Sequence, residues 1–270
     1  MSVNRVERAF AAAAAEGRAA LVVFVTAGDP DIDTTERLVP LLHSAGADVV
    51  ELGFPHSDPI GEGATIQLSS MRALARGVTL PRILESVKRA RAETDGAIVL
   101  MGYLNNVLAY GERSLARDAA AAGADGLIVA DTPYDAVPDL DVACEASDLA
   151  RILLVSPTTP PERVCAIATH SRGFVYCVAV TGVTGARREL PDDLAHAVAR
   201  IKRITDTPVA VGFGISTPEH AVEVARIADG VIVGSALVAR IGAADSPEAA
   251  ADAATAFVRS LRDAIDSAGR

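Results

Sequence analysis

The stretch DGVIVGS, residues 229–235, is the last of eight short apolar runs in this chain, and the count of eight decides the fold. Each run is almost continuously apolar, which is typical of parallel strands buried on both faces and not of half-exposed edge strands. The other seven runs are LVVFVT (21–26), DVVELG (48–53), AIVLMGY (97–103), DGLIVAD (125–131), RILLVS (151–156), GFVYCVA (173–179) and PVAVGFG (208–214).

Amphipathic segments separate these runs. Segments such as TTERLVPLLHSAG and PEHAVEVARIA carry apolar residues three and four positions apart with charges on the opposite side, as surface helices do. No proline-, glycine- or serine-rich linker divides the pattern. It therefore favours one (β/α)8 TIM barrel, with residues 1–270 as a single domain, over a doubly wound open sheet. An extra N-terminal helix over residues 3–16 is predicted to cover the bottom of the barrel.

Composition narrows the classes of partner. The net charge of −10 and the pI near 5.0 argue against nucleic-acid binding, which requires clustered Lys and Arg. No apolar run approaches the roughly 18 residues that span a bilayer, so we expect a soluble, cytoplasmic protein without membrane contact. Cys144, Cys165 and Cys177 lack metal-ligand spacing and lie in apolar stretches. We expect buried, reduced thiols and no metal site.

Three glycine-containing loops follow the last three predicted strands. In barrels of this kind, functional residues lie at the carboxyl ends of the strands, and the loops after strands seven and eight commonly bind phosphate through backbone N–H groups. Here TGVTG follows strand six, GFGIS follows strand seven, and VGSALV, which contains Ser235, follows strand eight. One such loop would indicate only a tight turn, but three on neighbouring strands favour a phosphate site. The polar segment that contains TGVTG is equally compatible with a mobile lid and an ordinary surface loop.

The stretch ELGFPHSDPIGEGATIQ, residues 51–67, contains the candidate acid/base groups. Glu51 ends the second strand between apolar neighbours, so burial is expected to raise the pKa of its carboxyl group; the alternative is a structural Glu paired with Arg. Asp58, before a proline, is interpreted as a loop residue. Glu62 lies between two glycines and fits either a pocket residue or a solvated loop residue. His56 is interpreted as a packed loop residue.

Tyrosines end two further strands. Tyr103 and Tyr176 would form either pocket walls with a hydroxyl group or ordinary core packing. A phosphate site on one side of the barrel mouth and two carboxylates on the other suit acid/base lyase or isomerase chemistry.

The order of these motifs resembles one family along nearly the whole chain. FVTAGDPD, ELGFPHSDPIGEGATIQ, MGYLNN, ADTP, TGVTGAR, VGFGIS and DGVIVGSALV together are similar to the α subunit of tryptophan synthase. The resemblance implies a (β/α)8 barrel that cleaves indole-3-glycerol phosphate to indole and glyceraldehyde 3-phosphate. It also implies that the chain has no cofactor of its own. Its partner would be a pyridoxal-phosphate-dependent β subunit in an αββα assembly, which receives indole through a tunnel.

The resemblance also implies roles for individual residues. Glu51 would protonate indole C3 and assist removal of the glycerol hydroxyl proton, and a loop beginning at Thr184 would close over the substrate. Together with the pocket residues inferred from the strand ends, the expected substrate-binding set is Phe24, Tyr103, Tyr176, Thr184, Gly185, Phe213, Gly214, Gly234 and Ser235. The residues expected to meet the β subunit are Pro55, Asp58, Asn105, Asp131 and Pro133.

The chain departs from the family pattern at one candidate catalytic position. Where the family has Asp-Gly-Pro after SDP and two further residues, this chain reads Glu62-Gly-Ala, and the family's aspartate accepts the indole N–H proton. Glutamate keeps the carboxylate and adds a methylene. Four hypotheses therefore stay open: a working α subunit with Glu62 as the base, a free-standing indole-3-glycerol phosphate lyase, a catalytically weak regulatory partner of a β subunit, or another phosphate-handling barrel enzyme such as an isomerase.

Overall fold

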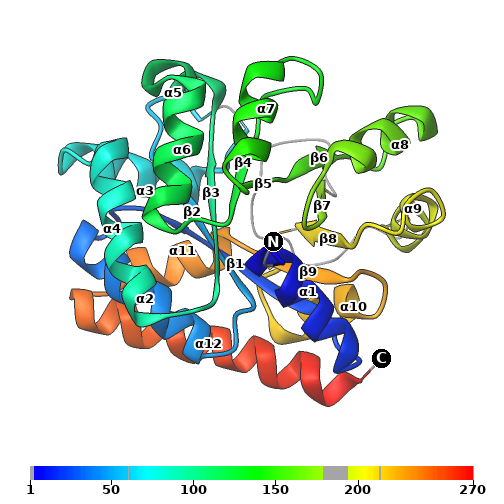
Figure 1. The fold of residues 1–270 in the computed structure, drawn as a ribbon. Coiled ribbons are helices and arrows are strands. Elements are labelled where there is room, and N and C mark those ends of the chain that lie inside the picture. The colour runs from blue at the N-terminus through cyan, green and yellow to red at the C-terminus, as the bar shows by residue number, and fades with distance from the viewer. Residues whose placement is uncertain (1–2, 60, 179–193, 213, 270) are drawn as a thin grey trace.

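The computed structural model describes residues 3–59, 61–178, 194–212 and 214–269, which form a barrel of parallel strands surrounded by helices (Figure 1). The sheet order is β5-β4-β3-β2-β1-β9-β8-β7-β6. The strands are β1 Ala20–Thr26, β2 Val49–Gly53, β3 Ala97–Gly102, β4 Gly126–Val129, β5 Ala150–Arg151, β6 Leu153–Val155, β7 Val175–Val178, β8 Val209–Gly212 and β9 Gly230–Val233. Every strand pair is parallel, as the continuous apolar runs predicted.

The predicted fifth run forms two short strands instead of one. β5 pairs with β4 and β6 pairs with β7, and only Ile152 separates them. The two edges of the sheet therefore belong to one short stretch of chain, which brings the sheet round into a barrel. The (β/α)8 prediction is confirmed.

Helices form the outer layer. After α1 (Arg5–Ala15) come α2 Ile32–Ser44, α3 Ala64–Ala75, α4 Leu80–Glu93, α5 Leu104–Tyr110, α6 Glu112–Ala122, α7 Pro138–Ala146, α8 Pro161–His170, α9 Leu194–Lys202, α10 Pro218–Ala225, α11 Ser235–Gly242 and α12 Pro247–Ala268. Alternate residues of β1 show the two apolar layers: Ala20 and Val22 pack inside the barrel, and Leu21 and Val23 pack against the helices. Among the described residues, no helix has the length and apolar character to cross a membrane.

The N-terminal helix α1, Arg5–Ala15, covers one end of the barrel, as predicted. Asn4 caps the helix through its side chain, which accepts a hydrogen bond from the Val6 N–H group (2.9 Å). Val6 and Phe10 are buried in the apolar cluster inside the barrel, where the Phe10 ring stacks on Phe174 with 4.9 Å between the ring centroids. The helix thus closes the end opposite to the carboxyl ends of the strands.

A polar side chain precedes each of the strands β2, β4, β7 and β9 and stabilises this end of the barrel. Each of these side chains accepts a hydrogen bond from a backbone N–H group of the preceding strand, at the residue where that strand begins or next to it. The four pairs are Asp48 with Leu21 (2.7 Å), Asp125 with Ile98 (2.9 Å), Ser171 with Leu153 (3.1 Å) and Asp229 with Val209 (3.0 Å). These hydrogen bonds link β1 with β2, β3 with β4, β6 with β7 and β8 with β9, so eight of the nine strands are joined in pairs at this end.

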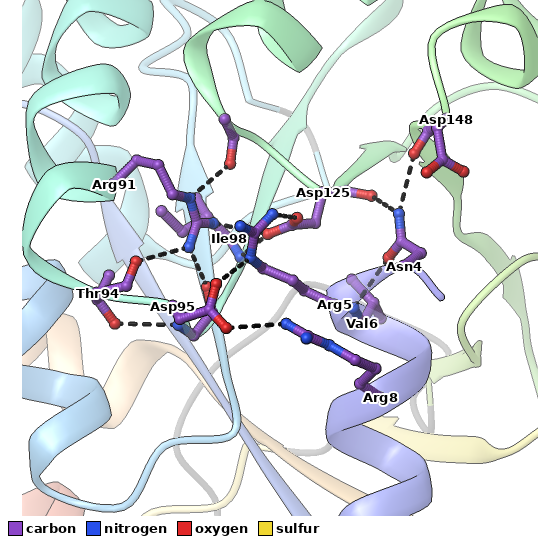
Figure 2. Close-up of polar contacts among 12 residues, drawn as sticks. Asn4, Arg5, Val6, Arg8, Arg91, Thr94, Asp95, Ile98, Asp125 and Asp148 are labelled. Atoms are coloured by element: carbon purple, nitrogen blue, oxygen red, sulfur yellow. Dashed lines mark hydrogen bonds and ion pairs between the residues drawn. The ribbon is translucent and has the colours of Figure 1, made fainter. Parts of the chain in front are cut away.

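Asp125 is the centre of the polar network in Figure 2. Its carboxylate contacts Arg91 at 2.7 Å and Arg5 of α1 at 3.2 Å, and its backbone carbonyl accepts from the Asn4 side chain at 3.0 Å. Through these hydrogen bonds and ion pairs, Asp125 connects α1 with α4 and with the paired strands β3 and β4.

The expectation for the cysteines is partly wrong. Cys144 and Cys177 are buried free thiols, but Cys165 is exposed. In α8 the neighbouring residues Val164, Ile167 and Ala168 face the core, which places Cys165 on the outer side of the helix.

Candidate active site

Glu51 points into the barrel at the mouth end of β2. It lies beside Phe24 of β1 and Val99 of β3, and it shares the inward face of β2 with Val49. The side chain is fully buried, and neither carboxylate oxygen has a hydrogen-bond partner among the described residues. Burial, with a smaller contribution from the charge of Glu62, raises the pKa of Glu51 to about 8. The expected burial is therefore confirmed, and within the same described ranges no arginine pairs with Glu51.

Glu62 is held at the same mouth, although it belongs to a loop. Only 8% of the residue is exposed, and it lines a cavity. Its backbone N–H group donates to the Pro59 carbonyl (2.9 Å), and its own carbonyl accepts from the Gln67 side chain (2.8 Å). Of the two interpretations left open by the sequence, the pocket residue is the one observed.

The cavity beside Glu62 is mostly apolar. Its lining residues are Phe24, Thr26, Phe54, Pro59, Glu62, Ile66, Ser70, Met101, Gly102 and Tyr103. Sequence reasoning included Phe24, Glu62 and Tyr103 in the site and missed Ile66 and Met101. Ile66 is inward-facing in a helix that starts after the loop, so only the helix position reveals it; Met101 follows from strand alternation in β3.

Three glycines near the strand ends each make room for an aromatic ring, which belongs to the neighbouring strand or, for Phe54, to the residue directly after it. A Cβ atom on Gly53 would collide with the Phe24 ring, and one on Gly102 would collide with the Phe54 ring. On Gly212 it would lie 2.6 Å from the Tyr176 hydroxyl oxygen. These glycines allow the rings to lie across the barrel mouth.

The two tyrosines differ in their surroundings. Burial raises the pKa of Tyr176 well above its usual value, and the charges of Glu51 and Glu62 raise it further, so its hydroxyl stays protonated near both carboxylates. Tyr103 lines the cavity and packs against His56 with 4.8 Å between ring centroids. His56 is thus a packed loop residue, as predicted.

The phosphate end is described only in part. Gly214, with φ of 51°, follows β8. Gly234 is the N-cap residue of α11 and Ser235 is its first residue, so the N–H groups that begin this helix lie at the carboxyl end of β9. Thr184, Gly185 and Phe213, together with the predicted lid segment, lie outside the described residues.

The expected partner-interface residues mostly lie on the surface. Asp58, Asn105, Asp131 and Pro133 are exposed, whereas Pro55 is buried. The Asp131 carboxylate accepts a hydrogen bond from the Leu104 N–H group (2.8 Å), which links the loop after β4 to the start of α5. Among the described residues, no group of His, Cys, Asp and Glu side chains is arranged to hold a metal ion.

Two buried carboxyl groups lie at the mouth of a (β/α)8 barrel, the end at which enzymes of this fold carry their functional residues, and such groups are suited to acid/base chemistry. Comparisons identify the family. A family model described as tryptophan synthase alpha chain matches residues 10–266. The chain belongs to this family, whose members are lyases of tryptophan biosynthesis.

Relatives and solved structures agree. The tryptophan synthase alpha chain of Citrifermentans bemidjiense is 53% identical over 236 residues, which cover 87% of this chain and 88% of the relative. That of Geobacter sulfurreducens is 48% identical over 263 residues, covering 97% and 99%. A structure of tryptophan synthase subunit alpha from Legionella pneumophila has a TM-score of 0.90 at 37% identity, covering 98% of this chain and 100% of that one. A Mycobacterium tuberculosis tryptophan synthase structure has a TM-score of 0.89 at 37% identity, covering 98% and 99%.

Proposed function

We propose that this chain is a working tryptophan synthase α subunit that cleaves indole-3-glycerol phosphate to indole and glyceraldehyde 3-phosphate, with Glu51 and Glu62 as its catalytic residues. The observation that carries this proposal is the pair of buried carboxyl groups at the mouth of the barrel. The pKa of about 8 keeps Glu51 protonated at neutral pH, beside the carboxylate whose charge helps to raise it. One group is therefore ready to donate a proton and the other to accept one.

The two groups have complementary tasks. Glu62 accepts the indole N–H proton while Glu51 protonates C3, which makes the ring an electron acceptor. The Glu51 carboxylate then takes the glycerol hydroxyl proton, the carbon–carbon bond breaks, and its electron pair returns to the ring. The ring nitrogen regains its proton from Glu62, and both carboxyl groups end in their starting states.

The remaining site residues would bind the two ends of the substrate. Phe24, Tyr103 and Tyr176 provide aromatic surface for the indole ring. Backbone N–H groups at Gly214, Gly234 and Ser235 bind the phosphate, with Gly185 completing that end. Thr184 and Phe213 belong to the same proposed substrate-binding set.

A β subunit is the proposed partner. The exposed residues Asp58, Asn105, Asp131 and Pro133 support a contact surface around the barrel mouth, with Pro55 beneath it. In this αββα assembly pyridoxal phosphate belongs to the β subunit, and the α chain acts without a cofactor. The biosynthetic role of the family supports a cytoplasmic location.

The test is indole release from indole-3-glycerol phosphate, measured with and without a tryptophan synthase β subunit. We expect cleavage that the partner stimulates. Cleavage at the same rate with and without the β subunit would identify a free-standing lyase. Stimulation of the β subunit without cleavage would identify a regulatory partner. Glu51→Gln should abolish cleavage yet still bind substrate, as calorimetry would show, while Glu145→Gln, on the exposed side of α7, should match wild type.

The glutamate at position 62 needs its own variant. Because Glu62 already lines the cavity, we expect Glu62→Asp to reduce kcat by about 10- to 100-fold, since shortening the side chain moves the carboxylate by about 1 Å. A faster Glu62→Asp enzyme would show instead that the native glutamate is a displaced base.

A further inference from the structure

Two polar contacts join α3 to the end of β1 and the loop that follows it. The Thr26 hydroxyl is hydrogen-bonded to the Ser69 hydroxyl at 2.6 Å, and both residues are buried. One turn further along α3, Arg72 makes two hydrogen bonds to the Asp29 carboxylate, from Nε at 2.7 Å and from Nη2 at 2.6 Å. Two parallel bonds between a planar guanidinium and a carboxylate define both distance and orientation.

The start of the same helix carries Glu62. Gly63 is its N-cap residue, so Glu62 lies immediately before the helix. Gln67 in the second turn bonds to the Glu62 carbonyl, and Ile66 packs against Phe24 of β1 and Val238 of α11. Any shift of α3 along β1 therefore moves Glu62 with it.

Glu51 is positioned from the same strand. In the β1–β2 pair, Phe24 lies opposite Glu51 and Thr26 lies opposite Gly53. The strand that determines the position of Glu51 thus also anchors the helix that follows Glu62. The separation between the two carboxyl groups depends on how α3 is held against β1 and its loop.

Arg72 reaches a third element as well. A Cβ atom on Gly242, the last residue of α11, would lie 2.6 Å from Arg72 Nη2, so the guanidinium packs directly over that glycine. The side chain of Arg72 is 40% exposed, whereas Asp29 is 2% exposed. Arg72 therefore lies at the surface and connects the buried carboxylate of Asp29 with the end of α11.

We infer that Arg72 is a positioning residue, whose paired hydrogen bonds to Asp29 hold α3 in place and so keep Glu62 at its working distance from Glu51. This inference rests on the proposed function, because it assigns Glu62 a working distance. It adds a residue that does not line the cavity and that acts through the position of Glu62.

The test uses the double variant Asp29→Asn with Arg72→Gln, which removes the pair without leaving a buried charge unpaired. We expect kcat for indole release to fall by about 10- to 100-fold, with KM changed less, because a displaced base impairs the chemical step more than binding. We also expect the pKa of Glu51 to fall, since moving Glu62 away removes the like charge that helps to raise it.

The matched control is Arg172→Gln. Arg172 is 36% exposed and makes two hydrogen bonds to the Glu7 carboxylate, but it lies at the opposite end of the barrel. This variant should lose stability and keep the wild-type kcat and Glu51 pKa. The inference is overturned if the double variant folds and its Glu51 pKa is unchanged, or if the control changes kcat and this pKa equally.

A failure of the proposed function would look different. The pKa of Glu51 can be obtained from the pH dependence of unfolding, with a Glu51→Gln protein as reference, and this needs no turnover. If wild type releases no indole but the double variant still lowers this pKa, the function is wrong and the positioning stands. If cleavage occurs and the pKa does not move, the positioning is wrong.

Discussion

Replacing Glu51 with Gln removes the proposed acid. We nevertheless expect the free energy of unfolding of this variant to increase, relative to that of wild type, as the pH rises. Inside the folded protein the pKa of Glu51 is about 8, whereas an exposed glutamate has a pKa of 4.5. The folded state therefore keeps the proton over an interval in which the unfolded chain has released it. Its contribution to stability is complete below pH 4.5 and is lost as the pH rises towards 8. Gln does not titrate, so the variant shows no such loss.

The magnitude follows from that interval. One proton bound by the folded state alone changes the free energy of unfolding by about 1.4 kcal/mol per pH unit. Between pH 4.5 and about 8 the total is about 5 kcal/mol, of which about 3 kcal/mol has been lost by neutral pH. An unpartnered buried amide offsets part of the gain, but this offset is the same at every pH.

Urea unfolding of both proteins, from about pH 5 to about pH 8, measures this difference. The free energy of the variant minus that of wild type should increase steadily with pH. Glu145→Gln, on the exposed side of α7, should give a flat line. A constant difference between the Glu51 variant and wild type would show that Glu51 titrates normally, and the assignment of a proton donor would lose its physical basis.

Three further outcomes are expected. The rate of indole release should fall above about pH 8, where Glu51 loses its proton, and a stopped assay across that range will show it; a rate that keeps rising would exclude Glu51 as the donor. Gly212→Ala should displace the Tyr176 hydroxyl and lower kcat/KM by about 10-fold or more. Urea unfolding should show that the free energy of unfolding falls by about 1–3 kcal/mol. Unchanged kinetics would show that Tyr176 does not belong to the site. Asp125→Asn should destabilise the protein by about 3 kcal/mol, because it removes the charge of a buried carboxylate that pairs with Arg91 and Arg5. Asp139→Asn, in an exposed pair, should change stability by less than about 1 kcal/mol, and equal effects of the two variants would contradict this reasoning.

The fold was predictable because the apolar pattern is local and repeated. Strands buried on both faces must be apolar throughout, and eight such runs with helices between them leave few alternatives to a barrel. The break in the fifth run was not predictable in this way: Arg151 and Ile152 read as part of one strand, and only the closing of the barrel assigns its two halves to different neighbours. The exposure of Cys165 depends on which side of α8 faces the sheet.

The site residues also differ in whether the local sequence or tertiary contacts determine their positions. Glu51 could be predicted because strand alternation alone turns it inward between apolar neighbours. Glu62 could not, because a loop residue between two glycines has no periodicity, and its place depends on a helix that follows it. That helix is held by Arg72, 43 residues away from Asp29 in sequence, and no local pattern pairs them. The position of Glu62 therefore depends on the contacts of α3 as well as on the hydrogen bond to Pro59 within the loop.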